Sequence, residues 1–126
     1  MRFLEFEEVN ELHRESLEAF GGATGIRDQG LIESALGSAI NTVVYGNGDA
    51  FDVAATYAFH ISQAQAFFDG NKRTAIGSAL AFLALNHPMR IPTPADRDAL
   101  YDAMIAIAEH TLDKPGLAAL LRRLFA

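Results

Sequence analysis

The residues best suited to chemistry lie together in one segment, which reads Gln65-Ala66-Phe67-Phe68-Asp69-Gly70-Asn71-Lys72-Arg73-Thr74. An acid, a glycine, an amide and two cations precede a long apolar stretch, and packing alone does not explain this arrangement. The N-terminus of a helix has free N–H groups and a partial positive charge, so it favours an anion. The segment therefore predicts a phosphate-binding site at the start of a helix.

Individual residue types in this segment support that prediction. Gly70 permits backbone conformations that aim successive N–H groups at one anion. Lys72, Arg73 and Thr74 add donors, and an arginine can bind phosphate through two N–H groups. The carboxylate of Asp69 is a candidate ligand for Mg²⁺, an ion that commonly joins a carboxylate to substrate phosphates.

A purely structural interpretation of the same residues stays open. Asp69 could cap the helix, Gly70 could make the turn, and Phe67 is expected to be a core anchor. Lys72 and Arg73 oppose the helix dipole, at a cost of about a few tenths of a kcal/mol each, which favours a bound anion. The segment lacks the GxxxxGK[ST] spacing and is therefore not a Walker A loop.

Two apolar helices are expected to position the segment. Residues 51–64 and 71–86 are hydrophobic on almost every side, which is typical of buried helices. Small residues between positions 75 and 79 allow a neighbouring helix to pack closely. Pro88 ends the second helix because proline cannot continue it. These two helices are predicted to form a central pair.

The remaining sequence predicts more helices and one exception. Helices are expected over residues 6–20, from an N-cap at Asp28, from a near capping box at Thr93 to about residue 110, and over about residues 115–125. Residues 43–48 run into Asn-Gly and predict a small β-hairpin flap, although a surface loop without function is an open alternative. The expected fold class is an all-α compact bundle, as a single domain of residues 1–126.

Composition indicates which kinds of partner and location are not expected for this chain. The formal net charge is -6, and the compact basic spots are residues 72–73 and 122–123, so binding to nucleic acid is not expected. The sequence contains no run of about twenty apolar residues, so no membrane span is predicted. The first residues lack the apolar region of a signal peptide, and there are no cysteines. A cytoplasmic protein is expected.

The run F-x-D-G-N-K-R-T, from Phe67 to Thr74, resembles the signature loop of the Fic/Doc family. The preceding segment, residues 54–60, is also similar to the family's buried helix, and the resemblance covers most of the chain. It implies the compact all-α Fic fold. It also implies transfer of AMP or, in the Doc (death-on-curing) branch, of a phosphoryl group from ATP to a protein hydroxyl.

The resemblance assigns roles to this segment and implies ATP and Mg²⁺ as cofactors. Asp69 matches the family's Mg²⁺ ligand, and Lys72 and Arg73 match its phosphate-contacting cations. The nucleotide-binding run it implies is Gly70, Asn71, Lys72, Arg73 and Thr74. Asp69, Asn71, Lys72 and Arg73 also count among its catalytic residues.

Two positions indicate the Doc branch. The AMP-transferring branch usually has glycine where Lys72 stands and arginine where Ile76 stands. The resemblance then implies a toxin that is paired with an antitoxin and phosphorylates translation elongation factor Tu. No Ser/Thr-x-x-x-Glu-Gly/Asn helix of the self-inhibiting type occurs, so an antitoxin chain is expected as the inhibitor, near the first two helices and the flap.

Gln65 departs from the family motif, which has its catalytic histidine at this position. A glutamine amide does not take up a proton near neutral pH, and loss of a general base typically costs about 10²–10⁴-fold in rate. The chain is expected to be impaired, either as a natural inactive member or through a substitution introduced so that a toxic protein can be produced. His60 is expected to be a core histidine, and His13, His87 and His110 are expected in surface or helix-end roles.

Three functions stay open on the sequence. The first is an impaired ATP-dependent phosphotransferase toxin, the second is a Fic-type AMP-transferase, and the third is a non-catalytic module that binds a nucleotide or a partner. Phosphate and AMP add different masses to a target protein, so mass spectrometry of the target distinguishes the first two functions.

Overall fold

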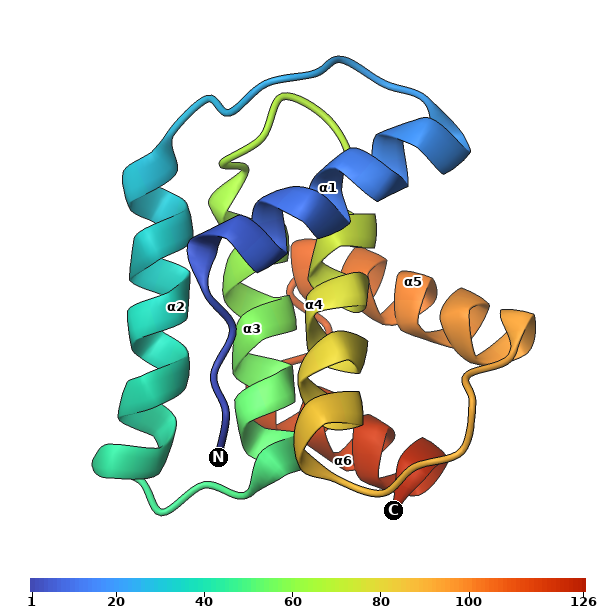
Figure 1. Cartoon of the computed structure of the whole chain (residues 1–126). Helices are drawn as coiled ribbons and strands as arrows, with labels where there is room; N and C mark the ends of the chain where they lie inside the picture. The colour runs from blue at the N-terminus through green and yellow to red at the C-terminus, as the bar shows by residue number, and fades with distance from the viewer.

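Six helices joined by loops make up the chain, and the computed structural model describes all residues 1–126 (Figure 1). The helices are α1 (Phe6–Phe20), α2 (Gln29–Val44), α3 (Ala50–Ala64), α4 (Asn71–Asn86), α5 (Pro94–Ala108) and α6 (Lys114–Phe125). The predicted all-α class is confirmed, since extended pairing is limited to one isolated bridge between Ile26 and Phe67. None of the helices is both long enough and apolar enough to cross a lipid bilayer.

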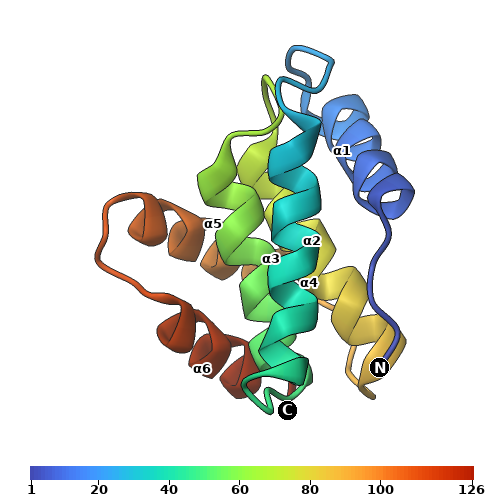
Figure 2. The ribbon, with the colours of Figure 1, turned by 90° about the vertical axis from the view of Figure 1, so that its left-hand side faces the viewer.

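The two apolar helices α3 and α4 form the predicted central pair. They lie side by side and run in opposite directions, with α2 against α3 and α1 across α4 (Figures 1 and 2). α5 and α6 cover the other side of the pair. Because every other helix packs on this pair, the loop that joins α3 to α4 is held from both of its ends.

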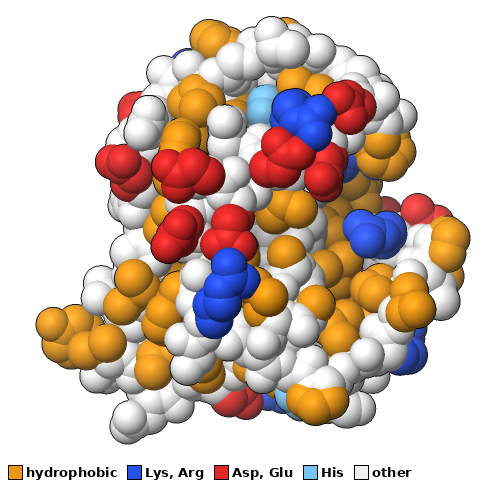
Figure 3. Space-filling model, viewed as in Figure 1, with side chains coloured by type: hydrophobic (Ala, Val, Ile, Leu, Met, Phe, Trp, Pro, Cys, Tyr) orange, Lys and Arg blue, Asp and Glu red, His pale blue; other side chains and the backbone are white.

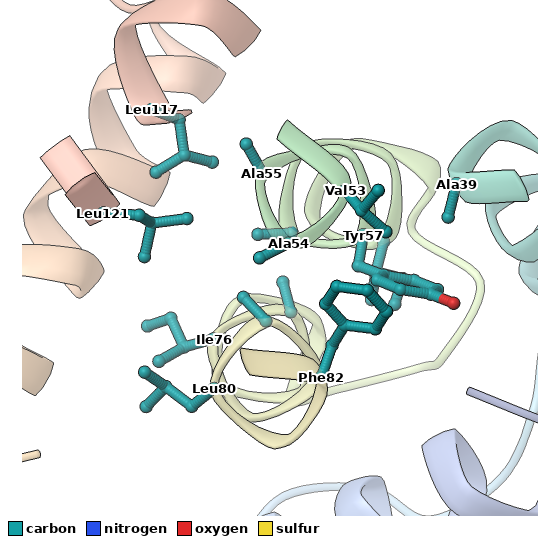
Figure 4. Packing of buried hydrophobic residues seen from close by; sticks show 14 of the residues in the cluster. Ala39, Val53, Ala54, Ala55, Tyr57, Ile76, Leu80, Phe82, Leu117 and Leu121 are labelled. Atoms are coloured by element: carbon teal, nitrogen blue, oxygen red, sulfur yellow. The ribbon is translucent and has the colours of Figure 1, made fainter. Parts of the chain in front are cut away.

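Small residues bring the two central helices together, and aromatic rings fill the space beside them. Ala54 and Ala75 are fully buried on facing helices. Tyr57 and Phe82 are also fully buried, with ring centres 5.4 Å apart (Figure 4). Burial of one such ring contributes about 1.5–3 kcal/mol to folding. The core therefore fixes the register of α3 against α4.

Side-chain caps define most helix starts, as the sequence predicts. The carboxylate of Asp28 accepts a hydrogen bond from the amide of Leu31 at 3.3 Å. Thr93 and Asp96 form the capping box expected at the start of α5. α4 differs, because its N-cap is Gly70 and no side chain accepts from its first amides. This exception marks the helix N-terminus that the sequence assigns to an anion.

The β-hairpin flap predicted at residues 43–48 is absent, and that prediction was wrong. α2 continues to Val44, and the next residues form a turn that leads into α3. The Thr42 hydroxyl bonds to the carbonyl of Ser38 and to the hydroxyl of Thr56, both at 3.0 Å, and the second of these bonds ties the end of α2 to α3. The Asn-Gly pair therefore makes a turn between helices, with Asn47 at a φ of 52°.

Candidate active site

Two loops at one end of the bundle support the candidate site. Residues 65–70 join α3 to α4, and residues 21–28 join α1 to α2 beside them (Figures 1 and 2). The amides of Arg27 and Asp28 donate to the carbonyl of Ala66 at 2.7 and 3.0 Å, and the amide of Phe68 donates to Gly25 at 3.4 Å. The main chains of the two loops therefore hold each other in place, far from the α2–α3 turn.

The N-terminus of α4 presents four amide groups without acceptors. Gly70 has the left-handed backbone angles φ 78° and ψ 17°. The amides of residues 70–73 donate to no group of the protein, and the first bond of the helix runs from Thr74 to the carbonyl of Gly70 at 2.9 Å. Such free N–H groups and the helix dipole together attract an anion.

Lys72 and Arg73 stand in the first turn of α4 and form no ion pair. The guanidinium carbon of Arg73 lies 3.6 Å from the ring centre of Phe20 and 4.9 Å from that of Tyr101. Aromatic faces attract a cation through the ring quadrupole. They hold the arginine without occupying its N–H donors, which stay available for a ligand.

These groups border a polar pocket of about 440 Å³. The sequence assigns seven residues to the site, and six of them, Gln65 and residues 69–73, line this pocket. Thr74, the seventh, is wholly buried one turn into α4, and its hydroxyl has no partner. The remaining lining residues come from α1, the two loops and α5: Ser16, Phe20, Gly21, Gly22, Phe68 and Tyr101.

The side chain of Asn71 fastens the loop to the helix. Its Oδ1 accepts from the amide of Phe67 at 3.1 Å, and its Nδ2 donates to the carbonyl of the same residue at 2.9 Å. The amide side chain is thus used within the protein, whereas the backbone N–H of Asn71 is free. Asn71 therefore shapes the turn that the resemblance assigns to anion binding.

Asp69 is the one carboxylate that lines the pocket. Its Oδ2 accepts from the amide of Ala23 at 2.6 Å. Gly22 permits this approach, because a Cβ added there would lie 3.0 Å from the Asp69 Cβ. No group of three or more metal-binding side chains occurs in the chain. A single carboxylate fits Mg²⁺ that completes its shell with water and phosphate oxygens.

Gln65 lies at the rim of the pocket, directly after α3. It has left-handed backbone angles, φ 55° and ψ 38°, which cost roughly 1–2 kcal/mol for a residue with a side chain. Arg27 supports this conformation by donating its Nε to the Gln65 carbonyl at 2.8 Å. The Gln65 side chain donates to the carbonyl of Ser62 at 3.0 Å. It offers no group that takes up a proton near neutral pH.

His13 does not line the pocket but packs against the loop that forms it, and its predicted surface role was wrong. It is 4% exposed, and its ring stacks on Phe67 with centres 3.8 Å apart. Its Nε2 lies 2.8 Å from the carbonyl oxygen of Asp69. Nothing local in the sequence marks His13, because α1 meets the loop only through the tertiary fold.

The other histidines contact neither the pocket nor its loop. His60 is half-buried in α3 and accepts a hydrogen bond from Lys114 of α6 at 3.0 Å. Burial and the nearby Lys114 charge lower the pKa of His60, so its neutral form is favoured. His87 ends α4, and His110 lies just beyond α5, as expected for helix-end residues.

Comparison with known proteins agrees with the geometry. The family model described as Fic/DOC family matches residues 3–83, which include the whole loop and His13. The chain belongs to the Fic/DOC family. It is 34% identical over 126 residues to protein kinase doc of Escherichia phage P1, covering 99% of this chain and 97% of that protein. It is 36% identical over 105 residues to Toxin Doc of Mycolicibacterium smegmatis, covering 80% and 78%.

Proposed function

We propose that this Fic/DOC chain is the toxin of a toxin–antitoxin pair, with a site built to transfer a phosphoryl group from ATP to a protein hydroxyl. The observation that carries the proposal is the open N-terminus of α4, where four free amides stand beside two unpaired cations. The names of its relatives, a protein kinase and a toxin, support the same reaction class.

Phosphate oxygens would accept hydrogen bonds from the free amides of residues 70–73. Lys72 supplies a point charge, and Arg73 can donate two parallel bonds to one phosphate. Hydrogen bonds to charged groups contribute about 1.5–3 kcal/mol each. Mg²⁺ held by Asp69 would neutralise phosphate charge. Binding of the nucleotide therefore depends on groups that are all present in this chain.

Transfer requires a further group, because the acceptor hydroxyl must lose its proton. Position 65, where the family's histidine stands by resemblance, is occupied by a glutamine whose amide is hydrogen-bonded to Ser62. Asp69 is the one carboxylate in the pocket, and its Oδ2 accepts a hydrogen bond from the amide of Ala23. We therefore propose that this chain retains nucleotide binding and is impaired in transfer by about 10²–10⁴-fold.

The direct test is the substitution Gln65→His. Purified protein is incubated with ATP, Mg²⁺ and elongation factor Tu, the target implied by the resemblance, and the added mass on the target is measured. A phosphate-sized increase is expected with Gln65→His and not with Gln65→Asn, the matched control without a base. An AMP-sized increase would instead support the AMP-transferase alternative. A variant that binds Mg-ATP and modifies no protein of a cell extract would favour a non-catalytic module.

The antitoxin would most simply occupy a groove whose lining is half hydrophobic. This groove, of about 980 Å³, lies between α1, α4, the loop after α4 and α5 (Figure 3). Ten of its 20 lining residues are hydrophobic, and its volume is comparable to about two turns of a helix. An amphipathic segment with apolar anchors would fit such a groove. The expected placement near the first two helices and a flap is kept only for α1, because the groove has no residue of α2 and there is no flap.

Hydrogen exchange tests this placement. The product of a neighbouring gene that co-purifies with this chain should protect amides of α1, residues 89–92 and α5. The groove is lined by three acids, Glu15, Asp98 and Asp102, and by three arginines, Arg73, Arg90 and Arg97, so the partner is expected to carry charges of both signs at its edge. Protection confined to residues 111–126 would contradict the placement, and no binding by any neighbouring product would contradict the partner proposal itself.

A further inference from the structure

His13 forms a directional contact with the active-site loop as well as a packing contact. Its ring is nearly parallel to the ring of Phe67, at an angle of 11°. Its Nε2 points at the carbonyl oxygen of Asp69, 2.8 Å away. A carbonyl oxygen only accepts hydrogen bonds, so Nε2 must carry the hydrogen. Both the neutral Nε2–H tautomer and the imidazolium satisfy this requirement.

This bond fixes the orientation of the peptide between Asp69 and Gly70. A trans peptide is planar, and its C=O and N–H groups point in opposite directions; the chain has no cis peptide. When His13 draws the Asp69 carbonyl toward α1, the Gly70 N–H must point away from α1. Gly70 lines the pocket, and its N–H is the first of the four amides that have no acceptor in the protein.

A flip of the same peptide would otherwise cost little. Gly70, at a φ of 78°, has no side chain to oppose other backbone angles. The Asn71 side chain holds both backbone groups of Phe67 and makes no bond to the Asp69 carbonyl. We propose that His13 is a positioning residue, whose hydrogen bond to Asp69 aims the Gly70 amide at the phosphate of the nucleotide.

Two variants separate the hydrogen bond from packing. His13→Phe keeps an aromatic ring on Phe67 and removes the donor, whereas His13→Gln restores an N–H donor at a similar reach. The control His87→Phe makes the same change at the far end of α4, where the ring only packs against Phe51. The readouts are the backbone ¹H–¹⁵N resonances of residues 69–73 without ligand, the thermal midpoint, and Mg-ATP affinity by calorimetry.

In His13→Phe we expect the Gly70 resonance to shift or broaden while resonances of α3 and α6 stay in place. Mg-ATP affinity should fall by about tenfold, the effect of one misdirected charge-assisted hydrogen bond. His13→Gln should recover most of both effects, and His87→Phe should change neither. An unchanged Gly70 resonance in His13→Phe would overturn the inference. So would a His13→Gln protein that behaves like His13→Phe, because packing would then explain both.

The affinity readout rests on the proposed function, and the resonance readout does not. If the unsubstituted protein binds no Mg-ATP while the Gly70 amide moves only in His13→Phe, the nucleotide proposal fails and the aiming of the amide by His13 stands. If Mg-ATP binds equally to all variants, the positioning role is refuted and the nucleotide proposal stands.

Discussion

The N-termini of α3 and α4 lie at opposite ends of the central pair and are completed in opposite ways. At α3, the Asp49 carboxylate accepts from the amide of Asp52 at 2.9 Å, and Asp52 accepts from the amide of Asp49 at 3.0 Å. The Arg122 guanidinium binds both carboxylates. At α4, a glycine without a side-chain cap precedes two cations that oppose the helix dipole.

The difference separates stability from binding. The α3 end is satisfied by groups of the chain itself, and a side-chain cap of this kind contributes about 1 kcal/mol to stability. The α4 end leaves its amides without acceptors and its two cations without an anionic partner. An unsatisfied helix terminus of this kind is completed by water or by a ligand. Substitutions at the N-terminus of α4 should therefore change the affinity for Mg-ATP, and substitutions at the N-terminus of α3 should change stability.

The largest expected effect follows from Arg73→Ala. Loss of its hydrogen bonds to phosphate should weaken Mg-ATP binding by about 10–100-fold. The thermal midpoint should change little, because relief of the unfavourable interaction with the dipole offsets the lost contacts with the rings of Phe20 and Tyr101. Calorimetric titration and thermal unfolding measure the two quantities.

Arg122→Ala is the matched control at the other end. It removes the cation that binds Asp49 and Asp52, so it should lower the thermal midpoint and leave Mg-ATP affinity unchanged. An Arg73→Ala protein that loses stability as Arg122→Ala does, and keeps its affinity, would remove the distinction between the two ends.

The helix boundaries were largely predictable because local residues determine them. Asp28 and Thr93 cap the helices that they were predicted to cap, and α4 ends two residues before Pro88. The end of α2 was mispredicted because a contact between helices decides it. Thr42 bonds to Thr56 of α3, and this tertiary contact supports helix where β-branched residues favour a strand.

The site was predictable only where it is contiguous in sequence. Residues 65 and 69–73 were identified as one run, and the pocket brings them together. His13 lies 56 positions from Asp69, and its place follows from α1 crossing α4. The pairing of residues 25–28 with 66–68 was also missed. Glycines at positions 21, 22 and 25 were its sole local sign, and all three have positive φ.

A smaller effect, on stability alone, is expected from Asp49→Ala at the N-terminus of α3. Removing this N-cap should cost about 1 kcal/mol, which lowers the thermal midpoint by roughly 4 °C in a domain of this size. Asp49→Asn should keep most of that stability, because asparagine caps helices as well as aspartate does. Neither substitution should alter Mg-ATP affinity.

The pH dependence of the same pair tests the charge of Asp49. Burial alone would raise the pKa of Asp49, but the Asp52 amide and the Arg122 guanidinium outweigh it and hold the pKa below its ordinary value. A carboxylate with a lowered pKa in the folded state adds stability above about pH 4 and loses it as the pH falls further. The midpoint of Asp49→Asn should thus decrease less below about pH 4 than that of the unsubstituted protein. Equal slopes in thermal melts from pH 6 to 2 would show that this ion pair adds nothing.

Only a small change in stability is expected from Lys72→Glu, which places an acid in the first turn of α4. A carboxylate in the first turn interacts favourably with the dipole, so the substitution should raise stability by about 0.3–1 kcal/mol. It should also weaken Mg-ATP binding, because a negative charge replaces a phosphate-binding cation. Lys72→Gln is the control, because it removes the positive charge without adding an acid. Its stability should lie between those of the unsubstituted protein and Lys72→Glu. The gap between the Glu and Gln variants should shrink at about 1 M salt, where charges are screened within about 3 Å. If Lys72→Glu is less stable than Lys72→Gln at low salt, the free amides of α4 do not form an electropositive end, and the contrast with α3 fails.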